Sequence, residues 1–509
     1  MFDSISRRDF VANSLKTGAL VGLADFAFLN GLPPVSAAEA KVQRNKVLFN
    51  SDVEPLVRLI EDTPREKLFE AVADKMRHGV GYQELLTGVF LAGVRGIQPR
   101  PVGFKFHAVL VINSAHLASQ AMPDRERWLP LFWALDNFKG SQEQNARQGN
   151  WVMAPVEDSK LPPGTQARER FIEAMDNWDE EGTDRAVAAL VRNAGAGEII
   201  ELFWRYGARD FRDIGHKAIY VANSWRTMQA IGWRHAEPVM RSLAYALLAH
   251  EQGNPAQRDA EPDRPWRENL KRVGDIRKGW QQGSSRPRAA ADLLKGLRTT
   301  SFSDACDQVV RLLNNGVSPD NVWDALFLRA GELLMQQPGI VGIHCVTSVN
   351  ALHYGYQASG NDETRRMLML QAAAFLALFN KRLGKKEHED RQIDTLEKVA
   401  VNSKGGEAVE EVLADISHDR VAAARKTIAL VESDPGQIHA LMTAARRLIF
   451  SKGRDSHDYK FSSAALEDFY HTTGPWRGRF LATSMFNLHG SGDDDNNLIE
   501  RARAALGKV

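Results

Sequence analysis

Apolar residues recur at three- and four-residue spacing along most of the chain, which is the period of an amphipathic helix. Alternation of apolar and polar residues with period two, the pattern of a half-buried strand, is nearly absent. The pattern therefore predicts an all-α fold. The clearest predicted helices cover Pro64–Met76, Tyr82–Val94, Arg125–Phe138, Thr183–Asn193 and Gly197–Tyr206.

The same pattern of residues occurs twice along the chain. Residues 72–138 align with residues 309–375 without a gap, and FHAVLVINSAHLASQA (106–121) lies opposite IHCVTSVNALHYGYQA (343–358). Weaker matches continue downstream, as far as Arg241 with Arg479. A period of about 240 residues is too long for a solenoid repeat. We therefore expect an internally duplicated protein with two pseudo-twofold-related domains of about six or seven helices each.

Composition along the chain suggests where these domains begin and end. Residues 251–290 are polar and rich in Pro, Gly, Arg and Gln, which is typical of a surface linker. The GSGDDDNN run (490–497) predicts a solvated loop before a last short helix. The expected organisation is a signal peptide over 1–40, helical repeat 1 over 41–250, a linker over 251–290, helical repeat 2 over 291–490 and a C-terminal tail over 491–509.

The first forty residues have the features of an export signal. SRRDFV (6–11) matches the twin-arginine pattern, a weakly apolar stretch follows, and small-residue cleavage options occur at 35–37 and 38–40. The alternative is a frayed helix with a chance arginine pair. We expect the twin-arginine translocation machinery to be a partner during export and the protein to be periplasmic. Because this machinery moves folded proteins, often with a cofactor already inserted, it favours a bound metal or redox group.

Charge and cysteine content exclude several classes of protein. The net charge is +1 and the basic residues are interleaved with acidic ones, so we expect no nucleic-acid partner. Only two cysteines occur, Cys306 and Cys345, and both are typical of small buried residues rather than a disulfide framework. No other run is apolar enough to cross a bilayer, so we expect no stable membrane span after cleavage.

Three pairs of histidines match across the duplication, and four of these residues are candidate metal ligands. Histidine is a costly residue to bury without a partner, so its retention in both halves needs a reason. His107, His216, His344 and His457 each follow a bend near the start of a predicted helix, from which side chains can converge. Imidazole suits iron, copper or zinc, and a noncovalent haem is a further option. The alternative is four histidines that brace helix ends.

The same two helices carry a second matched set of polar residues. Asn113, His116 and Gln120 lie at i, i+3 and i+7 and so share one helical face, which recurs in the second half. One interpretation is a hydrogen-bonded interface between the halves. The other is a pocket wall that binds substrate. The candidate substrate-binding residues are Asn113, His116, Gln120, Asn350, His353 and Gln357.

Short motifs for other chemistry are absent from the sequence. It has no HExxH, no Glu-x-x-His pair of the carboxylate-bridged type and no Cys-x-x-Cys-His for covalent haem. It also has no Gly-x-Ser-x-Gly elbow and no glycine-rich phosphate loop. The matched histidines therefore remain the main chemical signal.

The strings FKFHAVLVINSAHLAS, RERWLPLFWALD, IHCVTSVNALHYGYQ and HDYKFSSA resemble a group of twin-arginine-exported bacterial proteins that are internally duplicated and helical. More distantly, the helices with His107 and His344 resemble segments of the questin oxidase-like family. That family is helical, and its named members are linked to oxygenation of aromatic polyketides in a Baeyer–Villiger manner. The resemblance covers two short helices and implies an oxidoreductase, with His107 and His344 as candidate site residues.

Three hypotheses about function follow from these observations. The first is an exported, metal-dependent oxidoreductase that acts on a small organic substrate at a histidine-lined cleft between the two halves. The second is a non-catalytic periplasmic binding protein for a metal, haem or an apolar ligand. The third is a helical interaction scaffold. Metal content separates the third from the other two.

Overall fold

The computed structural model describes residues 45–507 apart from residue 125, and this part of the chain is all-helical. Its sole β feature is one isolated bridge between Ser284 and Val317. The predicted signal peptide lies outside the described residues. The helices of the first half are α2 (Glu54–Asp62), α3 (Leu68–Arg77), α4 (Tyr82–Gly96), α5 (His107–Leu110), α6 (Ile112–Gln120), α7 (Leu129–Arg147), α8 (Ala167–Asn177), α9 (Glu180–Asn193), α10 (Ala196–Gly207), α11 (His216–Ile231) and α12 (Ala236–Leu247).

The helices of the second half follow a similar order. They are α13 (Arg264–Arg272), α14 (Pro287–Leu297), α15 (Phe302–Asn314), α16 (Pro319–Gln336), α17 (Ile340–Ala358), α18 (Asp362–Leu383), α19 (Gly406–Ile416), α20 (Arg420–Ser433), α21 (Ile438–Lys452), α22 (Ser456–His471), α23 (Gly474–Ser484) and α24 (Leu498–Leu506). The predicted duplication would pair α8 and α9 with α19 and α20, and α11 and α12 with α22 and α23. The duplication itself stays a prediction, because helix order alone does not fix how two halves are related in space.

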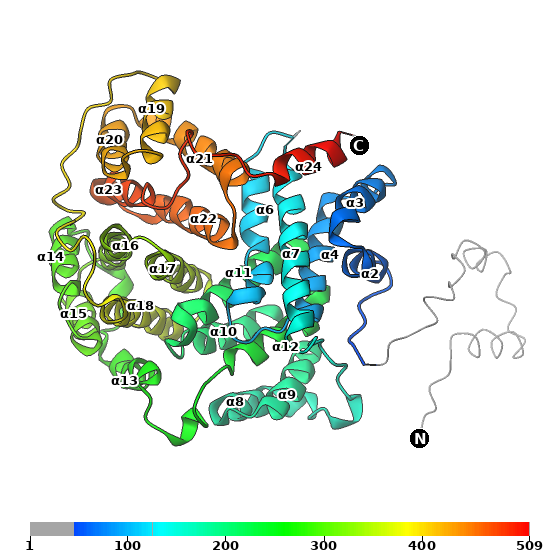
Figure 1. Ribbon diagram of the computed structural model, residues 1–509. Helices are drawn as coiled ribbons and strands as arrows, with labels where there is room; N and C mark the ends of the chain where they lie inside the picture. Colours follow the sequence, from blue (N-terminus) through cyan, green and yellow to red (C-terminus); the bar gives the residue numbers. More distant parts are fainter. Residues whose placement is uncertain (1–44, 125, 508–509) are drawn as a thin grey trace, which may run out of the picture. The chain divides into compact units, whose positions relative to one another are not determined.

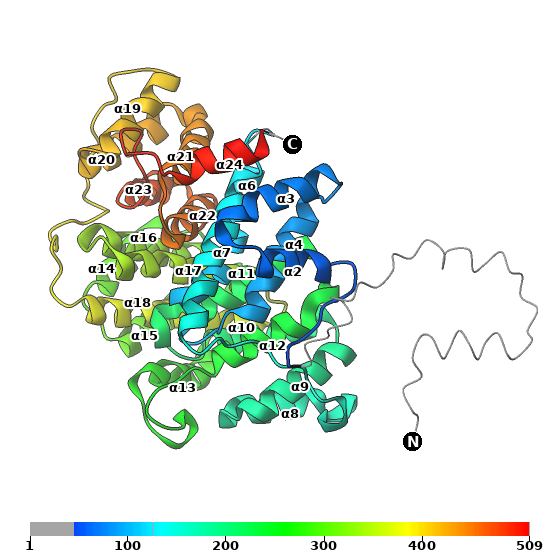
Figure 2. The ribbon, with the colours of Figure 1, turned by 45° about the vertical axis from the view of Figure 1, so that its right-hand side comes forward.

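Four helices from both halves pack together in the interior. Helix α11 packs against α17, α17 against α22, α22 against α6, and α6 against α11. Figures 1 and 2 show these four helices meeting in the middle of the helical body. Helix α17 is buried on nearly every face, which explains its almost unbroken run of apolar and small residues. This central four-helix group brings segments that are distant in sequence together at one end.

One segment differs from its sequence-based description, and another agrees with it. The predicted linker, 251–290, contains helix α13, and Asn269 of that helix is fully buried and donates a hydrogen bond to Gln371 at 2.9 Å. The polar composition of this segment reflects the exposed face of a helix rather than a solvated loop. The predicted last short helix is present as α24, which packs against α3 and α7.

Both cysteines are free and buried in helices, Cys306 in α15 and Cys345 in α17. Each thiol donates a hydrogen bond to a backbone carbonyl at 3.3 Å. The sulfur atoms therefore behave as small core groups, as the sequence predicts. Within the described part of the chain, every helix is too short or too polar to cross a membrane.

Candidate metal centre

The four histidines predicted as metal ligands all lie at the same end of the central four-helix group. His107 is the first residue of α5, and His216 is the first residue of α11. His344 lies one turn into α17, and His457 is the second residue of α22. Because each side chain projects from the start of a helix, four separate backbones deliver imidazoles to one small region.

Three of the four histidines form a close cluster. The Nε2 atom of His216 lies 2.9 Å from Nε2 of His107 and 2.9 Å from Nε2 of His344. The candidate ligand atoms of all three residues lie within 4.8 Å of one another. His344 is fully buried, His216 is 5% exposed, and His107 is part-buried. We call His107, His216 and His344 the histidine trio.

Backbone carbonyls fix the tautomer of each ring in the trio. The Nδ1 atom of His107 lies 2.8 Å from the carbonyl of Phe104, and that of His344 lies 2.6 Å from the carbonyl of Ile340. The Nδ1 atom of His216 lies 2.5 Å from the carbonyl of Asp213. A carbonyl can only accept, so each Nδ1 must carry the proton. Each neutral ring therefore presents an Nε2 lone pair to the centre of the trio.

The trio is held in the uncharged form. Burial lowers the pKa of His107, His216 and His344 well below the ordinary value, and the charge of Lys460 lowers all three further. Two neutral imidazoles that both carry their proton on Nδ1 cannot hydrogen-bond through Nε2. The two 2.9 Å contacts therefore bring lone pairs together with no proton between them, which is an arrangement that calls for a shared cation.

Lys460 is the charged group nearest to the trio. Its Nζ lies 3.3 Å from Nε2 of His216 and 3.2 Å from Nε2 of His344, and the residue is 2% exposed. Burial lowers the pKa of Lys460 to about 7. As an ammonium, Lys460 donates to both lone pairs. Among the described residues, Nε2 of His107 has its polar contact with Nε2 of His216 and none with Lys460.

His457 stands beside the trio rather than in it. Its ring centroid lies 4.7 Å from that of His107 and 5.3 Å from that of His344. Asp455 caps helix α22 by accepting the backbone N–H of His457 at 2.6 Å, and the same oxygen lies 3.2 Å from Nδ1. The hydrogen bond from His457 lowers the pKa of Asp455 to about 2. The capping interaction thus directs Nδ1 of His457 to a carboxylate.

Left-handed backbone precedes two of the trio residues. Gly103 and Phe104 have φ angles of 123° and 48° just before His107. Asp213, Ile214 and Gly215 have φ angles of 51°, 47° and 81° just before His216. Non-glycine residues in this region cost on the order of 1–3 kcal/mol each. Phe104 and Asp213 also supply the carbonyls that hold Nδ1, so the strain occurs where it orients the rings.

Close packing makes the two glycines specific for this site. A Cβ atom on Gly103 would lie 3.2 Å from Cε1 and Nε2 of His216. A Cβ atom on Gly215 would lie 2.1 Å from Oγ of Ser348. Glycine is therefore required at position 215 by space as well as by φ, whereas at position 103 it is favoured by φ and a new Cβ would be in tight contact with the His216 ring.

A polar pocket of about 330 Å³ opens beside the trio and reaches His107 and His457. One face of helix α7 forms much of its wall, and the turns before α5 and α22 form the rest. Its lining residues are Arg65, Phe104, Lys105, His107, Trp133, Asp136, Asn137, Gly140, Ser141, Gln144, Arg454, Asp455, Ser456 and His457. The pocket gives a small molecule access to the His107 side of the trio.

The predicted substrate-binding residues lie elsewhere, and none of the six lines this pocket. Asn350 donates to Glu467 at 2.7 Å and to Asp468 at 2.8 Å, and His353 packs among aromatic rings. Gln357 is exposed and contacts His471 at 3.1 Å. The structure thus places Asn350 and Gln357 in polar contacts with α22, and His353 in an aromatic contact with α16.

The three predicted substrate-binding residues of the first half also have separate surroundings. Asn113 is 2% exposed, and Gln120 is exposed. The Nδ1 atom of His116 lies 3.0 Å from the hydroxyl of Tyr82 on α4. The helix that carries these residues is interrupted at Val111, between α5 and α6, whereas its counterpart α17 is continuous.

Sequence reasoning missed Lys460, Lys105 and Arg454 as site residues. A signal for Lys460 was present, because its three-residue spacing from His457 puts both side chains on one face of α22. No such signal existed for Lys105 and Arg454, because their shared pocket forms only when the start of α5 meets the start of α22.

Comparisons of the chain with protein-family models, curated protein sequences and solved structures give no match. The functional argument therefore depends on the geometry of the trio and the pocket beside it. Three buried imidazoles with fixed tautomers and converging lone pairs form a group able to hold a metal ion.

Proposed function

We propose that this protein is a metal-dependent oxidoreductase whose metal is bound by His107, His216 and His344 and whose substrate is a small organic molecule. The observation that carries the proposal is the convergence of three Nε2 lone pairs, each ring being oriented by a backbone carbonyl through Nδ1. Protein metal sites hold their histidine ligands in this way.

The spacing of the ligand atoms favours a redox metal. Two metal–nitrogen bonds of 2.0–2.1 Å at a right angle place the nitrogens about 2.9 Å apart, whereas a tetrahedral angle places them about 3.3 Å apart. The two separations from His216 are both 2.9 Å. Right-angle ligation is typical of octahedral iron and of tetragonal copper, and three protein ligands leave positions open. Iron or copper therefore fits the trio better than tetrahedral zinc.

Residues of the pocket supply the other functions that such a site needs. The pocket meets the trio at His107, so a substrate there lies next to the proposed metal. Asp455 remains a carboxylate and holds Nδ1 of His457, which leaves Nε2 of His457 with a lone pair. We propose that His457 Nε2 accepts or returns a proton during turnover, and that Asp455 stabilises its charged form.

A second candidate function uses the same geometry without a metal. Lys460 donates to Nε2 of His216 and of His344, so its ammonium offers a cation in place of a metal ion. The cluster would then be a buried polar brace in a non-catalytic binding protein or a scaffold. Metal content distinguishes the two functions directly.

The deciding experiment measures metal in the full chain purified after export from its native host. The proposal predicts close to one iron or copper per chain by elemental analysis, and loss of that metal in His216→Ala. The matched control is His388→Ala, a part-exposed histidine far along the chain from the trio. Retention of metal by His216→Ala, or a metal-free wild type that cannot be loaded, contradicts the proposal.

We further propose that the protein reaches the periplasm through the twin-arginine translocation machinery. Support comes from the SRRDFV pattern and the small residues near 37–40. Replacing Arg7 and Arg8 together with Lys should leave an uncleaved precursor in the cytoplasm. Normal appearance of that double variant in the periplasm contradicts the assignment.

A further inference from the structure

One residue that lines the pocket beside the trio is a buried lysine without an acidic partner. Lys105 is 5% exposed, and its Nζ donates to the amide oxygens of Gln148 at 2.9 Å and Gln98 at 3.4 Å. Among the described residues, no carboxylate forms an ion pair with it. Buried lysines in proteins are nearly always paired with an acidic group. Lys105 is therefore a buried cation whose charge no carboxylate of the described residues compensates.

Arg454 is a second cation that lines the pocket and has no acidic partner for its side chain among the described residues. It is exposed and lines the same pocket, and its backbone N–H donates to the carboxylate of Asp458 at 2.8 Å. Its guanidinium makes no ion pair with any described residue. Guanidinium groups bind carboxylates in a bidentate manner.

The two carboxylates that line the pocket do not compensate these cations. Asp136 accepts two hydrogen bonds from Arg65, at 3.0 and 2.5 Å, and a third from Arg501 at 3.4 Å. Asp455 is engaged by the backbone and ring of His457. Both acids thus have partners, and the pocket keeps an excess of positive charge.

An apolar surface lies in the same pocket, next to His107. The side chain of Phe104 is 71% exposed, although it is a large hydrophobic group. Trp133 also lines the pocket, and its ring is fixed by stacking on Tyr459 with centroids 4.0 Å apart. Exposed aromatic surface beside converging polar groups is typical of a ligand site.

We infer that this pocket binds a small organic carboxylate with an apolar body, its anionic group at Lys105 and Arg454 and its body against Phe104 and Trp133. This inference deepens the proposed function, because it names the substrate class of the same site. A volume of about 330 Å³ lies at the small end of the range for ligand pockets, about 300–1,000 Å³. The body of such a ligand would lie next to His107.

Charge and desolvation explain why the anion is selected. A carboxylate gains charge-assisted hydrogen bonds from Lys105 and Arg454, and these are about twice as strong as neutral ones. A neutral amide of the same shape leaves the buried ammonium of Lys105 uncompensated. The pocket should therefore discriminate by charge between ligands that share one body.

The test uses benzoate and benzamide as probes, titrated calorimetrically into the full chain with its metal content measured in parallel. Benzoate should bind at least about tenfold more tightly than benzamide, a difference of about 1.4 kcal/mol. Lys105→Gln and Arg454→Gln should each weaken benzoate by about threefold or more and leave benzamide unchanged. Because Arg454 is exposed, its variant keeps the test valid even if Lys105→Gln folds poorly.

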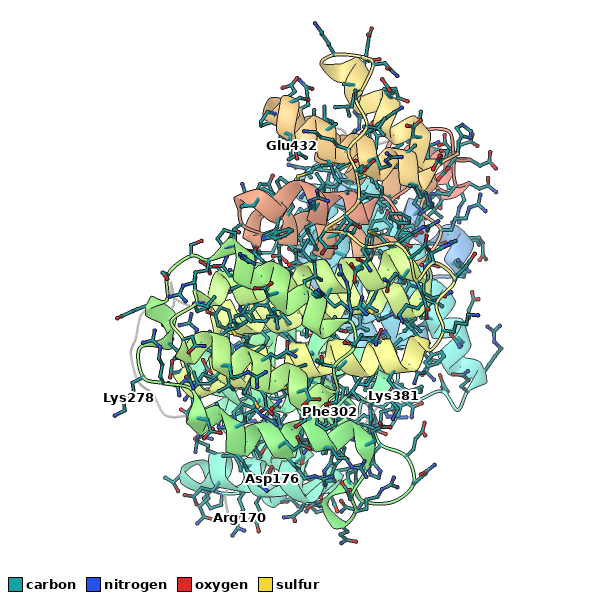
Figure 3. All side chains as sticks on the ribbon, turned by 90° about the vertical axis from the view of Figure 1, so that its left-hand side faces the viewer. Arg170, Asp176, Lys278, Phe302, Lys381 and Glu432 are labelled. Carbon is teal, nitrogen blue, oxygen red and sulfur yellow. The ribbon has the colours of Figure 1, made fainter. Side chains whose placement is uncertain are left out.

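A matched control comes from a second pocket of the same volume, lined by residues of α8 and α9. Arg170 in that pocket is labelled in Figure 3, where it projects from α8, and it is paired with Glu173. Arg170→Gln should leave benzoate affinity unchanged. Equal binding of the two probes, no benzoate binding, or benzoate affinity unaffected by both pocket variants overturns the inference.

The same titration separates this inference from the proposed function. Lys105→Gln and Arg454→Gln should retain the full metal content, because neither residue belongs to the trio. If His216→Ala retains its metal while the charge discrimination persists, the metal assignment fails and the carboxylate pocket stands. If His216→Ala loses its metal but benzoate and benzamide bind the wild type equally, the carboxylate assignment fails and the metal assignment stands.

Discussion

Two matched histidine pairs lie on the same two helical segments and have different surroundings. His107 and His344 meet through His216, with Nε2 atoms 2.9 Å from it on either side. His116 and His353, nine residues further along, stay apart. His116 contacts the hydroxyl of Tyr82, and His353 packs against Trp323 with ring centroids 4.7 Å apart.

The difference follows from where each pair lies on its helix. At the starts of α5, α11, α17 and α22 the four backbones deliver side chains to one point, whereas further along each helix faces different neighbours. The partners also differ in kind. The trio has backbone carbonyls and Lys460 around it, whereas His353 has the aromatic rings of Trp323 and Phe327 around it. Matched histidines mark a common site only where the helix geometry makes them converge.

The largest expected effect separates His344 from His353 on the same helix. Metal bound at 100 times its Kd stabilises the fold by about 2.7 kcal/mol, so a chelator should lower the Tm of the wild type. His344→Ala should abolish that chelator-dependent shift. His353→Ala should lower the Tm by loss of packing but keep the shift. Loss of the shift in both variants, or in neither, contradicts the distinction between the two pairs.

The second prediction concerns Gly103, whose Cβ would press on the His216 ring. Gly103→Ala should weaken metal binding by about tenfold or more, because a displacement of a few tenths of an ångström breaks ligand geometry. Gly149→Ala is the matched control, since Gly149 has a φ of 106° but no atom within 4 Å of a new Cβ. Both variants should lose about 1 kcal/mol of stability from φ strain. Equal metal affinity in the two variants would count against the trio as ligands.

The third prediction addresses Lys460, the cation that competes with the metal for Nε2 of His216 and His344. Lys460→Met removes this charge, so metal affinity should rise by about tenfold in a competition titration. The metal-free variant should be less stable by about 1–3 kcal/mol, because two buried lone pairs lose their donor. Lys139→Met, another buried lysine, is the control and should not change metal affinity. A Lys460→Met chain that binds no metal supports the metal-free alternative.

The smallest expected effect tests the pH dependence of stability that comes from Asp468, which accepts a hydrogen bond from Asn350. Burial raises the pKa of Asp468 well above its ordinary value, and Asn350 donates to it at 2.8 Å. The unfolded chain loses this proton near pH 3.9 while the folded chain keeps it, so Asp468 lowers stability as pH rises above about 4. Asp468→Asn removes that dependence. Its unfolding free energy relative to wild type should increase by at least about 1 kcal/mol between pH 4 and pH 7. A pH-independent difference contradicts the raised pKa.

Periodicity was sufficient to predict the all-α fold, because the core faces of single helices are local properties. The helix predicted over Tyr82–Val94 is found at Tyr82–Gly96, whereas the one predicted over Arg125–Phe138 begins at Leu129 and extends to Arg147. The polar face of α13 concealed a helix in the predicted linker. Such boundaries depend on tertiary contacts that a polar or apolar pattern does not encode.

The candidate site was predictable only in part. His107, His216 and His344 could be singled out because each has a matching histidine in the sequence alignment of the two halves. His457 lies outside the trio, where Asp455 caps α22 and holds Nδ1 of His457 by a hydrogen bond. The pocket forms where α7 packs against the turns before α5 and α22. Only the tertiary structure therefore identifies Lys105 as a residue that lines it.

The most direct test of the central claim is anomalous diffraction at the iron and copper absorption edges from crystals of the full chain. The proposal predicts a single anomalous peak about 2.0–2.1 Å from Nε2 of His107, His216 and His344. Lys460 Nζ should then lie further from both rings than its present 3.2–3.3 Å. Crystals of chain carrying its full complement of metal that show no peak at the trio, with Lys460 still donating to both rings, would contradict it.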